Sequence, residues 1–157
     1  RGLRQAVTDA VDGPPPGFLP ITQDNVRQVF DLVYAPWIKD LGLTDFVVRE
    51  GFVSARLPLN DRLKFVTGFV CGQALMSAID TVASIAAATT PRNTKGTVYQ
   101  HTHFLRPAVN DDFLVTAQVL RFGKASAYIE CGVTFAGSGE RPVGVSAASL
   151  HDTVEGE

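Results

Sequence analysis

The segment from 67 to 90 constrains the fold more than any other part of the chain, because it is apolar almost all round. Apolar residues recur in it at helical spacing, and alanines fill most of the remaining surface. The pattern predicts one long buried helix behind a short glycine-containing entry. The residues that set this spacing are Leu75, Ile79, Val82 and Ala86.

One polar line interrupts this apolar surface. Gln73, Ser77, Asp80 and Ser84 are separated by four, three and four residues, so they share one face of the helix. A carboxylate on a buried helix is costly unless it is paired, hydrogen-bonded or used in chemistry. The helix alone leaves two interpretations open: Asp80 bonds to a strand backbone or an arginine, or it has a function.

The segments around this helix predict strands. Short strands over 46–48 and 52–57, joined by a tight turn, precede it. Four strand-like segments joined by short connections follow it and predict hairpins and a meander. A single helix followed by a meander implies an antiparallel sheet curled around that helix, with edges that oligomerisation can cover. The four segments are 97–105, 113–122, 125–135 and 142–150.

The N-terminal part predicts a lead-in and a second helix. Residues 1–20 contain three consecutive prolines and predict an irregular lead-in. Thr22 or Asp24 then caps a helix that runs to about Lys39, and Pro36 breaks or tilts it. Within this segment we interpret Trp37 and its neighbour Ile38 as packing residues. We expect one domain over 21–151 and a frayed tail over 152–157.

Composition excludes several classes of function. Hydrophobic residues make up 45% of the 157 residues and charged residues 19%, as in a globular domain with a real core. The formal net charge of −2 and the absence of a basic cluster argue against nucleic acid as a partner. Asp80 interrupts the best apolar run, so we expect no membrane span. Two cysteines form no disulfide framework, and we expect a cytoplasmic protein.

Three strings between about 41 and 150 carry a family resemblance. Residues 68–73, GFVCGQ, are followed by Asp80 nine positions after Cys71, residues 103–108 read HFLRPA, and residues 119–124 read VLRFGK. These resemble the hotdog-fold acyl-CoA thioesterases of the phenylacetyl-CoA thioesterase (PaaI-like) type. That family opens its central helix with Gly-x-x-His-Gly-Gly, so Cys71 replaces its His and Gln73 its second Gly.

The resemblance implies an α+β hotdog fold, with an antiparallel sheet of about six strands wrapped around one central helix and an extra N-terminal helix. It implies an acyl-CoA thioesterase without a metal or other cofactor. Asp80 would be the general base or nucleophile, and the backbone N–H groups of Gly72 and Gln73 would form the oxyanion site. The family places these groups on different subunits, which implies a homodimer or a dimer of dimers with sites at the subunit interface.

Four further residues are candidates for substrate binding. Ser84 and Thr97 match family positions whose hydroxyls orient the carboxylate or the water, and Ser77 lies on the same polar line. Cys71 could act as a nucleophile at a helix start, but we expect a small residue that lines the pocket.

His101 and His103 share one face of a strand and could bind a metal, but a site would need further ligands, and we expect none. Several basic residues could meet the phosphates of coenzyme A, and the sequence does not rank them. They are Arg62, Arg92, Lys95, Arg106, Arg121 and Lys124.

Two other functions stay open. The first is a non-catalytic acyl-CoA or acyl-carrier binding module of the same fold, which the altered helix entry favours. The second is a hotdog dehydratase or hydratase, which would need a His on the central helix or its entry, where the sequence has none.

Overall fold

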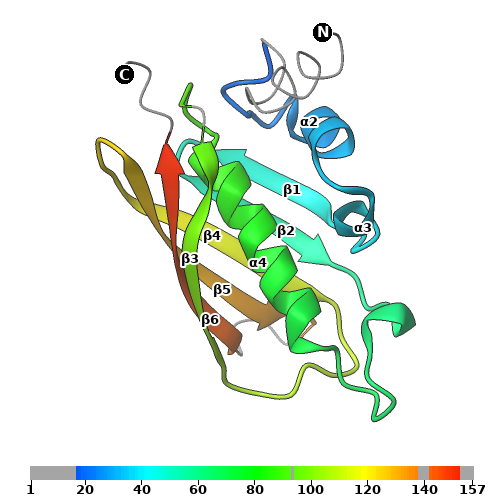
Figure 1. Cartoon of the computed structure of the whole chain (residues 1–157). Coiled ribbons are helices and arrows are strands. Elements are labelled where there is room, and N and C mark those ends of the chain that lie inside the picture. Colours follow the sequence, from blue (N-terminus) through cyan, green and yellow to red (C-terminus); the bar gives the residue numbers. More distant parts are fainter. Residues whose placement is uncertain (1–16, 93, 138–141, 153–157) are drawn as a thin grey trace, which may run out of the picture.

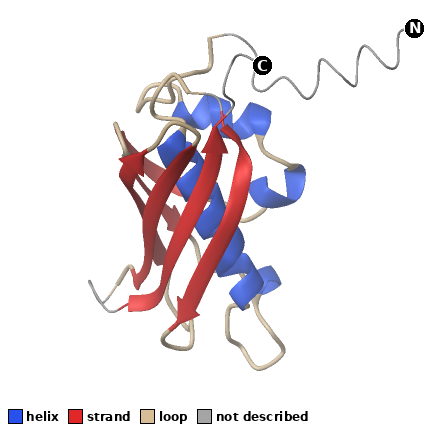
Figure 2. Ribbon diagram, turned by 60° about the vertical axis from the view of Figure 1, so that its left-hand side comes forward, coloured by secondary structure: helices blue, strands red, loops and turns tan. Residues whose placement is uncertain are grey.

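A computed structural model describes residues 17–92, 94–137 and 142–152 of the chain. Six antiparallel strands form one sheet that curls around the long helix α4, and two short helices lie beside it (Figures 1 and 2). The expected α+β fold is confirmed. The elements in chain order are α2 (Val26–Val33), α3 (Pro36–Lys39), β1 (Thr44–Arg49), β2 (Phe52–Leu57), the 3-10 helix η1 (Asp61–Leu63), α4 (Gly72–Ala87), β3 (Thr94–Phe104), β4 (Phe113–Phe122), β5 (Ser126–Phe135) and β6 (Pro142–Asp152).

The strand order is β1-β2-β4-β5-β6-β3. The predicted hairpins are therefore right for β4, β5 and β6, but wrong for β3, which pairs with β6 and lies at the far edge. The connection over 105–112 returns past two strands to β4. Eight residues can span up to about 26 Å when extended, so a short connection does not require neighbouring strands.

The predicted N-terminal helix is two helices. Pro36 lies in the first turn of α3, and Tyr34 before it is extended, so the expected break at this proline is confirmed. The first helix begins later than predicted, with Asn25 rather than Thr22 or Asp24 at its N-cap. The Asn25 side-chain oxygen accepts from the N–H of Thr22 at 2.8 Å, which closes the turn that leads into α2.

The core lies between α4 and the sheet. Ile79, Val82 and Ala86 on α4 are fully buried, as are Leu57 and Phe113 on strands β2 and β4. The strict alternation along β5 also follows prediction, since every second side chain of that strand is buried. Helix α4 thus packs its apolar side chains into the core and leaves Gln73, Ser77, Asp80 and Ser84 partly or fully exposed.

A register shift between Thr97 and Tyr99 reverses the faces of β3. Thr97 contacts α4 through a hydrogen bond to Asp80. Beyond the shift, the Gln100 amide donates to the Met76 carbonyl on α4 at 3.3 Å. Alternation along the strand then directs residues 101 and 103 to the opposite face of the sheet.

The chain ends are described only in part. Of the predicted lead-in, residues 1–16 lie outside the described residues and 17–20 form a loop. The Ile21 N–H then donates to the Ala88 carbonyl at 2.7 Å, which ties this segment to the end of α4. Of the predicted tail, Asp152 pairs with Thr94 inside β6, and 153–157 lie outside the described residues. No helix in the described part has the length and apolarity needed to cross a membrane.

Replacing Leu57, which is 0% exposed, with alanine should lower the free energy of unfolding by about 2–5 kcal/mol, because the core loses contacts and gains a cavity. Leu120→Ala is the matched control: this strand leucine is 64% exposed and should change stability by no more than about 0.5 kcal/mol. Urea unfolding at one fixed protein concentration measures both. Equal losses in the two variants would contradict the described core.

Candidate active site

The N-terminus of α4 offers two open backbone donors. Cys71 is the N-cap residue, and its side chain makes no capping hydrogen bond. Its carbonyl accepts from the N–H groups of Ala74 and Leu75 at 3.1 and 3.4 Å. Among the backbone hydrogen bonds of the described residues, none starts from the N–H of Gly72 or Gln73. These two donors and the positive end of a 16-residue helix suit a developing negative charge on a ligand oxygen.

Phe104 at the end of β3 lies directly against this helix start. A Cβ atom at position 72 would come within 3.1 Å of the Phe104 ring, so glycine permits this close approach. The ring itself is half exposed. Phe104 therefore covers one side of the helix start and leaves the other open.

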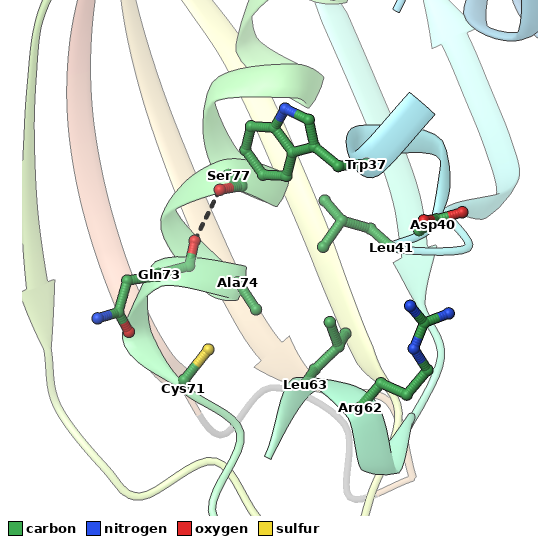
Figure 3. A pocket seen from close by; sticks show the side chains of 9 residues that line it. All are labelled: Trp37, Asp40, Leu41, Arg62, Leu63, Cys71, Gln73, Ala74 and Ser77. Atoms are coloured by element: carbon green, nitrogen blue, oxygen red, sulfur yellow. Dashed lines mark hydrogen bonds between the residues drawn. The ribbon is translucent and has the colours of Figure 1, made fainter. Parts of the chain in front are cut away.

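A cavity of about 280 Å³ opens on that other side (Figure 3). The Cys71 thiol points into it, and the indole of Trp37 lies over it, whereas the Gln73 amide points away from Trp37 (Figure 3). Trp37 is 61% exposed, so the interpretation of this residue as packing was wrong. The residues that line the cavity are Trp37, Asp40, Leu41, Arg62, Leu63, Cys71, Gln73, Ala74 and Ser77.

Asp80 lies on the β3 side of α4 and is half-buried. The Thr97 hydroxyl donates to its carboxylate. Among the described residues, the hydrogen-bond partner of Asp80 is therefore a threonine side chain, and not the strand backbone or arginine that one interpretation of the sequence offered. This hydrogen bond fixes one carboxylate oxygen and leaves the other available to a water or an acyl group.

Ser84 is engaged on the side of the N-terminal helices. Its hydroxyl lies 2.6 Å from the Tyr34 hydroxyl and donates to the Thr81 carbonyl at 2.7 Å. Burial raises the pKa of Tyr34 to about 12, the hydrogen bond with Ser84 opposes this rise, and the negative charge of Asp80 adds to it. Tyr34 therefore stays protonated to a higher pH than an exposed tyrosine would. The sequence analysis missed this residue.

Ser77 donates to the Gln73 carbonyl one turn earlier at 2.7 Å (Figure 3). Its oxygen can still accept a hydrogen bond from a ligand in the cavity. Asp80 lies seven residues beyond Gln73, which is about 10 Å along the helix axis. The carboxylate and the open donors of one chain are thus too far apart to act on one small acyl group.

The structure groups five of the seven predicted site residues in two places. Cys71, Gln73 and Ser77 line the cavity, while Asp80 and Thr97 are in contact on the other flank of α4. Sequence reasoning also missed Leu41, Leu63 and Phe104, which have no polar group to mark them. No group of three or more His, Cys, Asp or Glu able to hold a metal occurs among the described residues.

Comparisons with known proteins identify the family of the chain. The model of the thioesterase superfamily matches residues 67–140. A Thermoplasma volcanium protein provisionally named an esterase is 30% identical over 95 residues, which covers 60% of this chain and 71% of that protein. The chain therefore belongs to the thioesterase superfamily.

Solved structures share its fold. Zebrafish thioesterase superfamily member 2 has a TM-score of 0.74 at 20% identity, covering 83% of this chain and 98% of its own. The PaaI protein of the Escherichia coli phenylacetic acid degradation operon has a TM-score of 0.73 at 20% identity, covering 83% and 92%. A Streptococcus mutans protein, smu.793, was solved bound to acetyl-CoA and has a TM-score of 0.64 at 17% identity, covering 69% and 87%. The expected hotdog fold is confirmed.

The two cysteines should differ in reactivity. Burial raises the pKa of Cys131 to about 12, and the negative charges of Asp80 and Glu130 add to this rise. Its thiol should therefore stay unreactive at pH 8, whereas Cys71, which is half-buried beside the cavity, should react. A colorimetric thiol reagent should label one cysteine per chain in buffer and two in guanidinium chloride. Rapid labelling that persists in Cys71→Ser would contradict this assignment.

Proposed function

We propose that the protein is an acyl-CoA thioesterase that works as a homodimer. The observation that carries this proposal is the pair of open N–H groups at Gly72 and Gln73, beside a cavity and on the same helix as Asp80. Membership of the thioesterase superfamily supports the reaction class. The fold shared with a protein that binds acetyl-CoA supports the acyl carrier.

The reaction requires stabilisation of charge and activation of a nucleophile. The thioester oxygen accepts hydrogen bonds from the N–H groups of Gly72 and Gln73 as negative charge develops on it. Asp80, held by Thr97, takes a proton from water as the water oxygen attacks the carbonyl carbon, or attacks that carbon itself. The C–S bond breaks, and coenzyme A leaves as the thiol after taking up a proton. When water attacks, the acyl group leaves directly as the free acid. When Asp80 attacks, it forms a mixed anhydride, which water then hydrolyses to the free acid and the restored carboxylate.

A second copy of the chain supplies the carboxylate. Strand β3 is an edge strand whose outer side carries no partner strand in the described residues. Val98, Tyr99, Phe104 and Leu105 along and just beyond it are half or more exposed. Pairing of this edge with a second copy covers these side chains and satisfies backbone groups. It also brings the Asp80 flank of one α4 toward the Gln73 end of the other. Two such dimers can also pair to form a dimer of dimers.

The substituted helix entry favours one alternative. Cys71 and Gln73 replace a family His and Gly, so a module that binds acyl-CoA without hydrolysing it is the second candidate. The backbone N–H of Gln73 is unaffected by its side chain, which is why hydrolysis ranks first.

Two free cysteines suit a reducing compartment, and we place the enzyme in the cytoplasm.

Asp80→Asn should reduce acyl-CoA hydrolysis by at least about 10³-fold, because the amide neither accepts a proton nor attacks a carbonyl. Release of coenzyme A from a panel of aliphatic and aromatic acyl-CoAs measures this loss. Asp31→Asn is a matched control, since Asp31 is an exposed residue on α2 paired with Arg27 at 3.0 Å. Full turnover in Asp80→Asn would refute the assignment, and acyl-CoA binding without turnover by the wild type would establish the binding module.

The backbone donor can be removed without removing the helix. Proline at position 73 lacks the N–H but fits a first helical turn, where that group has no helical partner. Gln73→Pro should lower kcat by about 10²–10³-fold, as loss of one oxyanion donor does. Gln73→Ala keeps the N–H and should retain most of the activity. Circular dichroism checks folding of both variants, and equal activity in the two would rule out the backbone donor.

A further inference from the structure

Two histidines on β3 converge through their ring nitrogens. The Nε2 atoms of His101 and His103 lie 3.0 Å apart, and the ring centroids are separated by 4.5 Å. Both side chains are exposed. In a neutral pair, one ring donates this hydrogen bond and the other accepts it. Both nitrogens therefore point into one small space at the surface.

This pair lies apart from the candidate active site. The register shift at Thr97 and Tyr99 directs Gln100 and Phe104 toward α4, so His101 and His103 occupy the opposite face of the sheet. Strand β3 therefore separates the two histidines from the groups of the candidate active site. The proposed hydrolysis uses neither histidine.

The separation of the nitrogens suits two ligands of one ion. Imidazole nitrogens bind divalent transition metals at about 2.0–2.1 Å, so two of them 3.0 Å apart subtend about 91–97° at the ion. This is close to the 90° between neighbouring ligands in square-planar and octahedral complexes, and well below the tetrahedral angle of about 109° that zinc prefers. Replacing the shared proton by a metal ion then needs little movement of either ring.

We propose that His101 and His103 form a surface site for a divalent transition metal of the nickel or copper class. The two Nε2 atoms occupy neighbouring coordination positions. In this proposal, water or the same histidines of a second copy paired along this edge fill the remaining coordination positions. The geometry favours Ni²⁺ over Zn²⁺.

Calorimetric titration of the untagged full chain with Ni²⁺ tests this site. Ni²⁺ is chosen because it does not oxidise the Cys71 thiol as Cu²⁺ can. The wild type should bind Ni²⁺ more tightly than Zn²⁺. His101→Asn and His103→Asn should each weaken Ni²⁺ binding by about tenfold or more, because the second ligand then no longer adds its effective concentration to the first.

The third histidine provides the matched control. His151 pairs in register with Gly96, at the other end of β3 from the pair. His151→Asn should bind Ni²⁺ as tightly as the wild type, and circular dichroism checks that all three variants fold. Equal Ni²⁺ affinity in the wild type and in His101→Asn or His103→Asn would overturn the proposal, as would loss of binding in His151→Asn alone.

Discussion

Packing of α4 against the curled sheet is the constraint on which the rest of the structure depends. Its alanine, valine and isoleucine side chains are buried, and the helix packs against strands β2 to β6. Because those faces pack in the core, Gln73, Ser77, Asp80 and Ser84 lie on the less buried part of the helix surface. The helix starts at Gly72, where the ring of Phe104 approaches so closely that a Cβ atom would lie 3.1 Å from it. One buried helix thus positions both the open donors and the carboxylate.

The polar residues at and along α4 lie on two flanks of the helix. On one flank, α3 and the η1 loop close a cavity over Cys71 and Ser77 (Figure 3). On the other flank, Thr97 of β3 holds Asp80. A single chain therefore contains both halves of the proposed thioesterase site but separates them along the helix. The exposed edge of β3 supplies the surface through which two chains can join these halves.

Much of the fold could be predicted from the sequence, because α4 and β5 have simple periodic patterns. The place of β3 could not, since a local pattern carries no information about which sheet edge a strand joins. The convergence of His101 and His103 could not be predicted from the sequence either. The sequence places the two residues on one face of a strand, but the distance between their ring nitrogens depends on the side-chain rotamers. The role of Trp37 was predicted wrongly because a large apolar side chain is equally common in a core and in the wall of a cavity.

Complementation between two inactive variants tests the central claim, that each site joins Asp80 of one chain to the Gln73 N–H of another. Asp80→Asn and Gln73→Pro are each refolded alone and together from denaturant. The account predicts that an equal mixture regains about a quarter of wild-type hydrolysis, since half of the dimers are mixed and each mixed dimer holds one intact site of two. Mixed dimers that form, as native mass spectrometry would show, but stay as inactive as the separate variants would contradict a site shared between chains.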